Sequence, residues 1–260
     1  MITSNQNQKI QKVKSLITQS KDRRNSLQFV IEGIRLSEEA LQANWEFEFI
    51  LFSENLAERG LELLKKAQKN KIPIDKIPLP LMKKIAGTET PQGIIGVLQQ
   101  REQAIPYQPD LILICDAIKD PGNLGTILRS ADAANAQAVI LAPTCVDQYS
   151  PKVVRAGMGA HFHLPIIQMD WDSIKSTCKD ESFKFQTLVA SADADLNCWQ
   201  VDFRKPTAII IGSESTGPSQ EAYQLADKLI KIPMPGSSES LNAAIAASII
   251  LFEAVRQRWQ

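Results

Sequence analysis

Residues 232–252 read Ile-Pro-Met-Pro-Gly-Ser-Ser-Glu-Ser-Leu-Asn-Ala-Ala-Ile-Ala-Ala-Ser-Ile-Ile-Leu-Phe. The stretch leads from an apolar strand end, through two prolines, a glycine and a polar cluster, directly into a helix. The first ten helical residues, Ala243 to Phe252, include one polar side chain. Because a surface helix ordinarily has a polar face, we expect this helix to be surrounded by protein. Polar groups at a helix N-terminus bind ligands well, although a buried helix with a serine cap has the same pattern.

The second half of the chain predicts a mostly parallel sheet covered by helices. It begins with the continuous apolar run Leu111–Cys115, which is typical of a strand covered on both faces. Strands and helices then alternate, which indicates an α/β domain whose ligands bind beyond the carboxyl ends of the strands. The further strands are expected at 138–141, 187–189, 208–211 and 229–232, and the helices near 123–134, 151–156, 171–178, 218–225 and 240–257.

Two more loops at strand ends carry polar side chains. The loop after the strand 111–115 contains two glycines, then Asn123 at a helix start and Arg129 about two turns later. A plain strand-turn-helix connection with an Asn cap would look the same. The loop after the strand 208–211 holds Glu214, which would repel a phosphate but orient a cation or a hydroxyl, or simply cap the next helix. Neither loop matches the Walker or the G-x-G-x-x-G pattern.

The first hundred residues predict a separate, smaller α/β domain. Its strands are expected at 27–31, 47–52, 72–77 and 93–98, and its helices at 6–20, 34–43, 56–69 and 79–85. A polar segment with two prolines follows and is typical of a linker. We therefore expect a domain at 1–100, a linker at 101–109 and a second domain at 110–260.

Charge is balanced overall but unevenly distributed. The chain of 260 residues has 29 basic and 29 acidic side chains, so its net charge does not draw it to nucleic acid or membrane. Residues 1–105 hold 16 basic and 12 acidic residues, whereas residues 106–260 hold 13 and 17. The segment 9–24 has a basic excess that fits contact with a polyanion, or equally a solvated helix face.

Several classes of protein are disfavoured by the sequence. The cysteines at 115, 145, 178 and 198 form no C-x-x-C pair, so neither a metal site nor a disulfide framework is expected. The polar N-terminus lacks the apolar run of a signal peptide. The longest apolar run, at 243–252, is far shorter than the roughly 20 residues that span a bilayer. We expect a soluble cytoplasmic protein.

Three motifs, in this order, resemble those of a known enzyme family. They read D-x-x-x-D-P-G-N-L-G-x-I-x-R-S-A at 116–131, I-I-I-G-S-E-x-x-G-P-S at 209–219 and I-P-M-x-G-x-x-E-S-L-N-A-A-x-A-A at 232–247. They are similar to the motifs of the SpoU-type (TrmH-like) RNA ribose 2′-O-methyltransferases of the SPOUT superfamily. The resemblance covers residues 110–260. It extends more weakly to Phe29–Arg35 and Thr88–Ile94, which look like that family's substrate-binding domain, related to an RNA-binding ribosomal-protein fold.

The resemblance implies a fold and a reaction. The fold is α/β, with a mostly parallel C-terminal sheet that contains a deep trefoil knot, an exception to the rule against knots, preceded by a small α/β RNA-binding domain. The implied enzyme is a homodimer that binds S-adenosylmethionine in the knot loops and methylates a ribose 2′-hydroxyl in structured RNA. The separate N-terminal domain favours ribosomal over transfer RNA.

The motifs also imply roles for individual residues. The polar catalytic set is Asn123, Arg129, Glu214, Ser240 and Asn242. The cofactor pocket is formed by Gly212, Ile232, Met234 and Leu241, with Ser191 as an additional candidate. Contacts to RNA are expected from Lys21, Arg23, Arg24, Arg35 and Arg155. The chain departs from the family pattern at Asn135, where many members have Gly, and at Ala243-Ala244, where many have Val-Ser.

Methyl transfer from a sulfonium is an in-line displacement, so the enzyme has to position the 2′-oxygen and help it lose a proton. Arginine keeps its proton in almost any protein environment. We therefore expect Arg129 to stabilise developing alkoxide charge or to grip the adjacent phosphate, while Ser240 or the RNA phosphate relays the proton. Glu214 is expected to orient Arg129 or Asn123, and Asn242 to hold the loop or the ribose.

Three other functions stay open at this point. The chain could methylate a ribose of transfer RNA. It could be a non-catalytic RNA-binding protein that retains the fold, which predicts the loss of a motif residue, and none is lost. It could also be an enzyme with a different nucleotide cofactor in an open doubly wound sheet, against which stand Glu214 and the missing nucleotide fingerprints.

Overall fold

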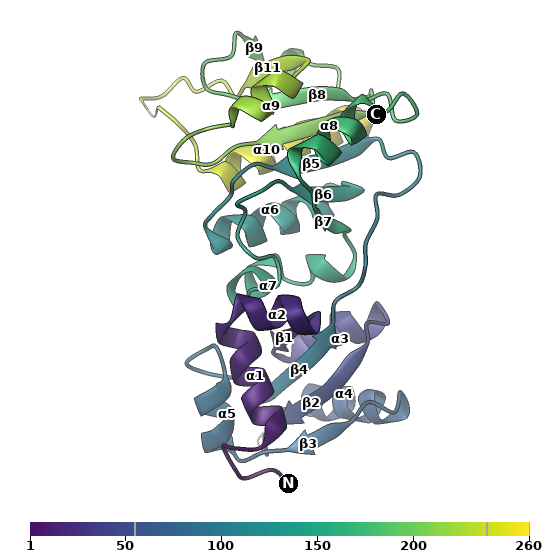
Figure 1. Cartoon of the computed structure of the whole chain (residues 1–260), viewed down its shortest axis with the longest axis vertical. Coiled ribbons are helices and arrows are strands. Elements are labelled where there is room, and N and C mark those ends of the chain that lie inside the picture. Colours follow the sequence, from purple (N-terminus) through teal and green to yellow (C-terminus); the bar gives the residue numbers. More distant parts are fainter. Residues whose placement is uncertain (55, 238, 260) are drawn as a thin grey trace. The chain divides into compact units, whose positions relative to one another are not determined.

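The computed structural model of the chain describes residues 1–54, 56–237 and 239–259. They form two compact units (Figure 1). Unit 1 comprises residues 1–102 together with 149–162, and unit 2 comprises residues 103–148 together with the chain from 163 onward. Unit 1 is built on a four-stranded sheet and unit 2 on a seven-stranded sheet.

Unit 1 has helices on both faces of a mixed sheet with the order β1-β4-β2-β3. Strand β4 is antiparallel to both of its neighbours, and β3 is parallel to β2. Side chains alternate between the faces, so Phe29 and Ile31 point into a core with α3 and α4, and Val30 points into a core with α1 and α5. The strands are β1 (Gln28–Glu32), β2 (Phe47–Phe52), β3 (Ile74–Lys76) and β4 (Ile94–Gln99), and the helices are α1 (Gln8–Thr18), α2 (Ser20–Ser26), α3 (Ile34–Gln42), α4 (Glu58–Lys69), α5 (Leu79–Ile85), α7 (Pro151–Gly157) and the 3-10 helix η1 (Ala160–Phe162).

Residues 149–162 complete the core of unit 1, although they come from the second half of the chain. The ring of Tyr149 lies 4.7 Å from that of Phe29, and the ring of Phe162 packs edge-on against Trp45 at 5.4 Å. These four aromatic residues belong to one buried cluster. The core of unit 1 therefore depends on residues that lie beyond the expected linker at 101–109.

We expect Tyr149→Ala to lower the free energy of unfolding by about 3 kcal/mol, because a large buried side chain is replaced by a cavity. The measurement is urea unfolding of the full chain, followed by circular dichroism. Tyr107→Ala is the matched control, since Tyr107 is 87% exposed, and it should stay within about 0.5 kcal/mol of the parent. Equal unfolding midpoints for the two variants would show that residues 149–162 do not support this core.

Unit 2 contains an all-parallel sheet with the order β7-β6-β5-β10-β8-β11-β9, which confirms the expected mostly parallel architecture. Strands β5 and β10 are paired so that Cys115 lies opposite Ile211. The loops that follow these two strands therefore begin side by side. The strands are β5 (Leu111–Cys115), β6 (Ala138–Leu141), β7 (Ile166–Gln168), β8 (Gln186–Ala190), β9 (Leu196–Asn197), β10 (Thr207–Ile211) and β11 (Lys228–Lys231).

Helices cover this sheet and bury its central strands. Side chains of α8 and α9 share a buried cluster with Ile112 and Ile114 of β5, while α10 packs along α6 and against β10. Strands β5, β6 and β10 are buried along their whole length. The helices are α6 (Pro121–Ala133), α8 (Trp171–Lys179), the 3-10 helix η2 (Cys198–Gln200), α9 (Gln220–Leu225) and α10 (Ala243–Arg258).

Helix α10 is not surrounded by protein within one chain, so that expectation is wrong for the single chain. Ala247, Ile250 and Leu251 are fully buried, but Ile245 is 51% and Phe252 49% exposed. The apolar composition of the helix thus serves two faces, one packed inside unit 2 and one open. The helix also begins at Ala243 rather than near 240, because Asn242 forms its N-terminal cap.

Five short elements, α2, β7, β9, η1 and η2, are not indicated by the sequence pattern. Strands β7 and β9 form the two edges of the sheet in unit 2 and have three and two residues. So short a segment shows no recognisable alternation. None of the described helices combines the length and the hydropathy needed to cross a bilayer.

Candidate functional site

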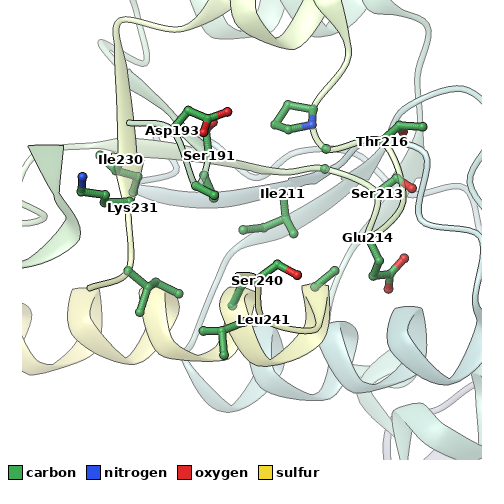
Figure 2. A pocket seen from close by; sticks show the side chains of 18 of the residues that line it. Ser191, Asp193, Ile211, Ser213, Glu214, Thr216, Ile230, Lys231, Ser240 and Leu241 are labelled. Atoms are coloured by element: carbon green, nitrogen blue, oxygen red, sulfur yellow. The ribbon is translucent and has the colours of Figure 1, made fainter. Parts of the chain in front are cut away.

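A cavity of about 350 Å³ opens at the carboxyl ends of β8, β10 and β11 (Figure 2). Its walls are the loops that follow these strands and the start of α10. This is the edge at which parallel α/β sheets bind their ligands. Among the lining residues are Ser191, Asp193, Ile211, Ser213, Glu214, Thr216, Ile230, Lys231, Ser240 and Leu241.

The loop after β10 folds back on itself at Gly212. A Cβ atom on Gly212 would lie 2.3 Å from the backbone nitrogen of Pro218 and 2.5 Å from the carbonyl carbon of Gly217. No side chain fits at such distances, so this close approach requires glycine. The N–H of Gly217 donates to the carbonyl of Ser213 at 2.9 Å and closes the loop, which leaves Glu214 exposed near its tip.

A chain of hydrogen bonds joins the three motif loops. The Nδ2 of Asn123 donates to Oε1 of Glu214. The Nδ2 of Asn242 donates to Oδ1 of Asn123 at 2.9 Å. The Oδ1 of Asn242 in turn accepts from the N–H groups of Ala244 and Ile245 at 2.9 and 3.3 Å, which caps α10. The side chain of Asn123 is thus held from two sides, by Glu214 of the loop after β10 and by Asn242 at the start of α10.

Helices α6 and α10 are held together further along their length. Asp120 caps α6 by accepting from the N–H of Asn123 at 2.8 Å. The hydroxyl oxygens of Ser130 and Ser248 lie 2.7 Å apart and link the two helices. Arg129, next to Ser130, is exposed on α6. Its side chain is therefore accessible to a substrate. The helix that carries it is joined to α10 at two places, through Asn123 and Asn242 and through Ser130 and Ser248.

The structure gathers most of the expected site residues. All residues expected to bind the cofactor line the cavity, namely Ser191, Gly212, Ile232, Met234 and Leu241. Of the expected catalytic residues, Glu214 and Ser240 line it, and Asn123 and Asn242 are connected to Glu214. Arg129 is not among the lining residues. Sequence reasoning missed Asp193, Thr216, Tyr223 and Lys231, three of which were recognisable only by their place at or just after a strand end.

The residues expected to contact RNA lie in unit 1 in different environments. Lys21, Arg24 and Arg35 are exposed. Arg23 is 4% exposed and donates to the carbonyl of Leu16 at 2.5 Å, so it holds the end of α1. Arg155 is partly buried beside Gly87. Two lysines of the same basic segment are engaged in ion pairs, Lys9 with Asp75 at 2.5 Å and Lys12 with Glu48 at 2.7 Å.

Metal-ligating groups and cysteine thiols are the other reactive side chains to consider. In the described part of the chain, no three His, Cys, Asp or Glu side chains come together as metal ligands. The thiol of Cys145 donates to the carbonyl of Cys115 at 3.2 Å. Burial raises the pKa of Cys145 to about 11, so the thiol stays protonated at neutral pH and is a poor nucleophile. The polar groups of the cavity and the adjoining motif loops are amides, carboxylates, hydroxyls, the ammonium of Lys231 and the guanidinium of Arg129.

The parallel sheet has a cavity of small-molecule size at its carboxyl edge, and three loops place a polar cluster beside it. This arrangement is that of an α/β protein that binds a small molecule at a reaction centre. The chain belongs to the SpoU rRNA Methylase family, which residues 110–252 match. Residues 7–96 match the MRM3-like substrate binding domain. The family resemblance of the three motifs is thereby confirmed.

Similarity to known proteins extends over nearly the whole chain. The chain is 33% identical to an uncharacterised tRNA/rRNA methyltransferase of Synechocystis, over 99% of this chain and 94% of that protein. It is 31% identical to the 23S rRNA (guanosine(2553)-2′-O)-methyltransferase RlmP of Bacillus subtilis, over 96% and 97%. The crystal structure of the SpoU methyltransferase AviRb from Streptomyces viridochromogenes, in complex with the cofactor AdoMet, has a TM-score of 0.85 at 29% identity and covers 97% of this chain and 99% of that chain.

The turn at Gly212 gives a matched pair of variants. Gly212→Ala should weaken AdoMet binding by at least about tenfold, because the new methyl group displaces the backbone of 217–218 from the cavity wall. Gly236→Ala should leave binding unchanged, since a Cβ atom there meets nothing within 4 Å. Isothermal titration with AdoMet measures both. Equal affinities for the two variants would contradict a binding site in this cavity.

Proposed function

We propose that the chain transfers a methyl group from S-adenosylmethionine to a ribose 2′-hydroxyl of ribosomal RNA. The observation that carries the proposal is the cavity beside the Glu214–Asn123–Asn242 hydrogen bonds, which the three SpoU motifs build together. The relatives support it, since one is named as a 23S rRNA 2′-O-methyltransferase and one was crystallised with AdoMet.

The cavity fits a cofactor of nucleoside size. Its volume of about 350 Å³ lies within the range of small-molecule pockets, roughly 300–1,000 Å³. Apolar walls from Ile211, Met234 and Leu241 suit an adenine ring, while Asp193 and Ser191 offer polar partners for ribose hydroxyls or an amino group. When bound, S-adenosylmethionine supplies an electrophilic methyl group on a sulfonium.

The protein's own residues have to position and activate the 2′-oxygen. The amide of Asn123 is locked because it donates to Glu214 and accepts from Asn242, and a preorganised group of this kind orients a substrate at little entropic cost. In the proposal, Arg129 stabilises the negative charge that develops on the 2′-oxygen. Ser240, on the cavity wall, or the RNA phosphate relays the proton.

Two measurements test this function. Titration of the purified chain with AdoMet should show saturable binding. Mapping of ribose methylation in total RNA, from cells with and without the gene, should show the loss of a ribosomal 2′-O-methyl group. A missing methyl group on a transfer RNA would establish that alternative substrate. RNA binding without AdoMet binding would establish the alternative of a non-catalytic RNA-binding protein. The sequence argues against that alternative, because every expected catalytic residue is present.

Arg129→Lys separates the two roles open to this residue. We expect kcat to fall about 100- to 1,000-fold with little change in RNA affinity, because an ammonium group does not reproduce the planar donor set of a guanidinium. Arg204→Lys, which alters a surface ion pair with Asp202, is the control and should keep full activity. Full turnover of Arg129→Lys with weakened RNA binding would assign Arg129 to a phosphate contact instead.

Unit 1 is proposed to bind the RNA substrate, in keeping with its match to a substrate binding domain. The exposed cations Lys21, Arg24 and Arg35 are the proposed phosphate contacts. Arg155, which is partly buried beside Gly87, is a further candidate. Arg23 is left out, because its guanidinium already binds the carbonyl of Leu16 inside unit 1.

Changing Lys21, Arg24 and Arg35 together to Gln should reduce the slope of log K against log salt by about 2–3, roughly one for each lost phosphate contact. Filter binding of ribosomal RNA over a salt series measures the slope. Lys9→Gln is the control, because the ammonium of Lys9 is already neutralised by Asp75, and its slope should match the parent. A triple variant with the parental slope would place the RNA elsewhere.

We further propose that two chains pair through the open apolar face of α10. Ile245 and Phe252 lie two turns apart on this face and are about half exposed, so a partner that covers them removes apolar surface from water. The homodimer expected from the family supplies such a partner. Sedimentation of the chain as a single protomer would contradict the pairing.

The trefoil knot and the cytoplasmic location belong to the same proposal. In support of the knot, β10 lies between β5 and β8, and β11 lies between β8 and β9, so late strands are inserted among earlier ones. The three motif loops meet where these inserted strands end. A ribosomal substrate is consistent with the cytoplasm. Tracing the C-terminal segment in an experimental structure tests the knot, and an unthreaded path would remove it.

A further inference from the structure

We propose that Asp116 is a positioning residue for this reaction, which holds both ends of the loop 212–218 and thereby fixes Glu214 and one wall of the cofactor cavity. Asp116 is the first residue after β5 and belongs to neither the cavity lining nor the catalytic set above. The kinetic part of the inference rests on the proposed function. The structural part rests on the hydrogen bonds of Asp116 alone.

Asp116 binds the residues that flank the loop. Its backbone N–H donates to the carbonyl of Ile211 at 2.8 Å. Its Oδ2 accepts from the backbone N–H of Ser219 at 2.6 Å. Ile211 is the residue before the loop and Ser219 is the residue after it. Asp116, at the end of β5, therefore holds together the two ends of the loop that follows β10.

The carboxylate of Asp116 is buried, at 2% exposure of the residue. Burying a carboxylate is unfavourable unless it accepts hydrogen bonds. A bond from a backbone N–H to a carboxylate is charge-assisted and stronger than a neutral one. The Ser219 contact is therefore both the compensation for burial and a firm anchor for the end of the loop.

The backbone next to Asp116 is held in an unusual conformation. Ala117 has φ 55°, in the left-handed region that alanine rarely adopts. Such a conformation persists only where the surroundings impose it, and it is common beside functional sites. The bonds of Asp116 fix one side of Ala117, and a bond from the N–H of Val146 to the carbonyl of Ile118, at 2.9 Å, fixes the other.

We call the two hydrogen bonds that Asp116 makes to Ile211 and Ser219 the clamp. The clamp can influence the reaction centre because the loop 212–218 between these residues has little conformational freedom. Within the loop, Gly212 is pressed against the backbone of Pro218, and Gly217 bonds to Ser213. A shift of the loop end at Ser219 is therefore transmitted along the loop to Glu214. Glu214 accepts from Asn123, so the position of that amide depends on Asp116 without any direct contact.

Hydrogen exchange of the protein without cofactor tests the clamp. In Asp116→Ala, the amides of 212–219 should exchange about tenfold faster, the effect of losing one net hydrogen bond. In Asp116→Asn the increase should be smaller than in Asp116→Ala, because the side-chain oxygen still accepts from Ser219 but without the charge. Asp172→Ala, an exposed carboxylate on α8, is the control. Parental exchange of the loop in Asp116→Ala overturns the inference.

A double-mutant cycle tests the path to Glu214. If Asp116 acts through this residue, Glu214→Gln should lower kcat much less in the Asp116→Ala background than in the parent. Ser191→Ala, in the loop that follows β8, should have the same effect on the AdoMet affinity in both backgrounds. An additive cycle for Asp116 and Glu214 overturns the positioning role.

A second variant covers the case in which Asp116→Ala does not fold. Ser219→Pro removes the N–H that Asp116 binds, and the φ of Ser219, −71°, suits proline. Ser219→Ala keeps that N–H and serves as its control. Loosened exchange should appear in Ser219→Pro only. If the parent fails to bind AdoMet, the proposed function fails while the exchange experiment still decides on the clamp.

Discussion

The site depends on the parallel pairing of β5 with β10, in which Cys115 lies opposite Ile211. The two strands are almost a hundred residues apart in the sequence, yet they end at the same level, so the loops that follow them start in contact. The loop after β10 can turn tightly there only because Gly212 has no side chain. Short, tightly packed loops bring Asn123 and Glu214 within hydrogen-bonding reach, whereas long loops would have to lose more conformational freedom.

The position of helix α10 is the second constraint on the site, because hydrogen bonds hold the helix at both ends. At its start, Asn242 caps the helix and binds Asn123. At its end, Gln257 accepts from the N–H of Phe203 at 2.8 Å, and Arg258 donates to the carboxylate of Asp110 at 2.7 Å. The segment that leads into the helix forms a wall of the cavity. Its position is therefore set by contacts with both the first and the middle parts of unit 2.

The sequence predicted those parts of the structure that leave a local pattern. The bounds of β2, β5 and β6 agree with the expected ones, and for β5 the reason is plain, because its apolar run lies between Asp110 and Asp116. The motif loops also met as expected, since parallel strands bring their carboxyl ends to one edge. Asn135, where the family resemblance leads us to expect Gly, has φ 55°, a value that Asn tolerates better than most residues. The departure from the family pattern is thus compatible with the turn.

The features that were missed depend on distant partners. Nothing near Tyr149 or Phe162 indicates that these rings would pack against Phe29 and Trp45. A count of positive charges cannot distinguish Arg23, which is buried against carbonyl groups, from an exposed neighbour such as Arg24. Likewise, the apolar sequence of α10 predicts a buried helix, but it does not say whether the same chain or another one buries it. Tertiary contact decides each case, and no local pattern encodes it.

The distribution of charge matches the proposed division of labour between the units. The excess of basic residues lies in 1–105 and the excess of acidic residues in 106–260. Carboxylates at the cavity, Asp193 and Glu214, would repel RNA phosphates if they had to bind them, whereas they attract a ligand with positive charge, such as a sulfonium. With two carboxylates and one lysine, Lys231, in its lining, the cavity suits the cationic cofactor better than its neutral by-product. In the proposal, attraction of the polyanion is left to unit 1.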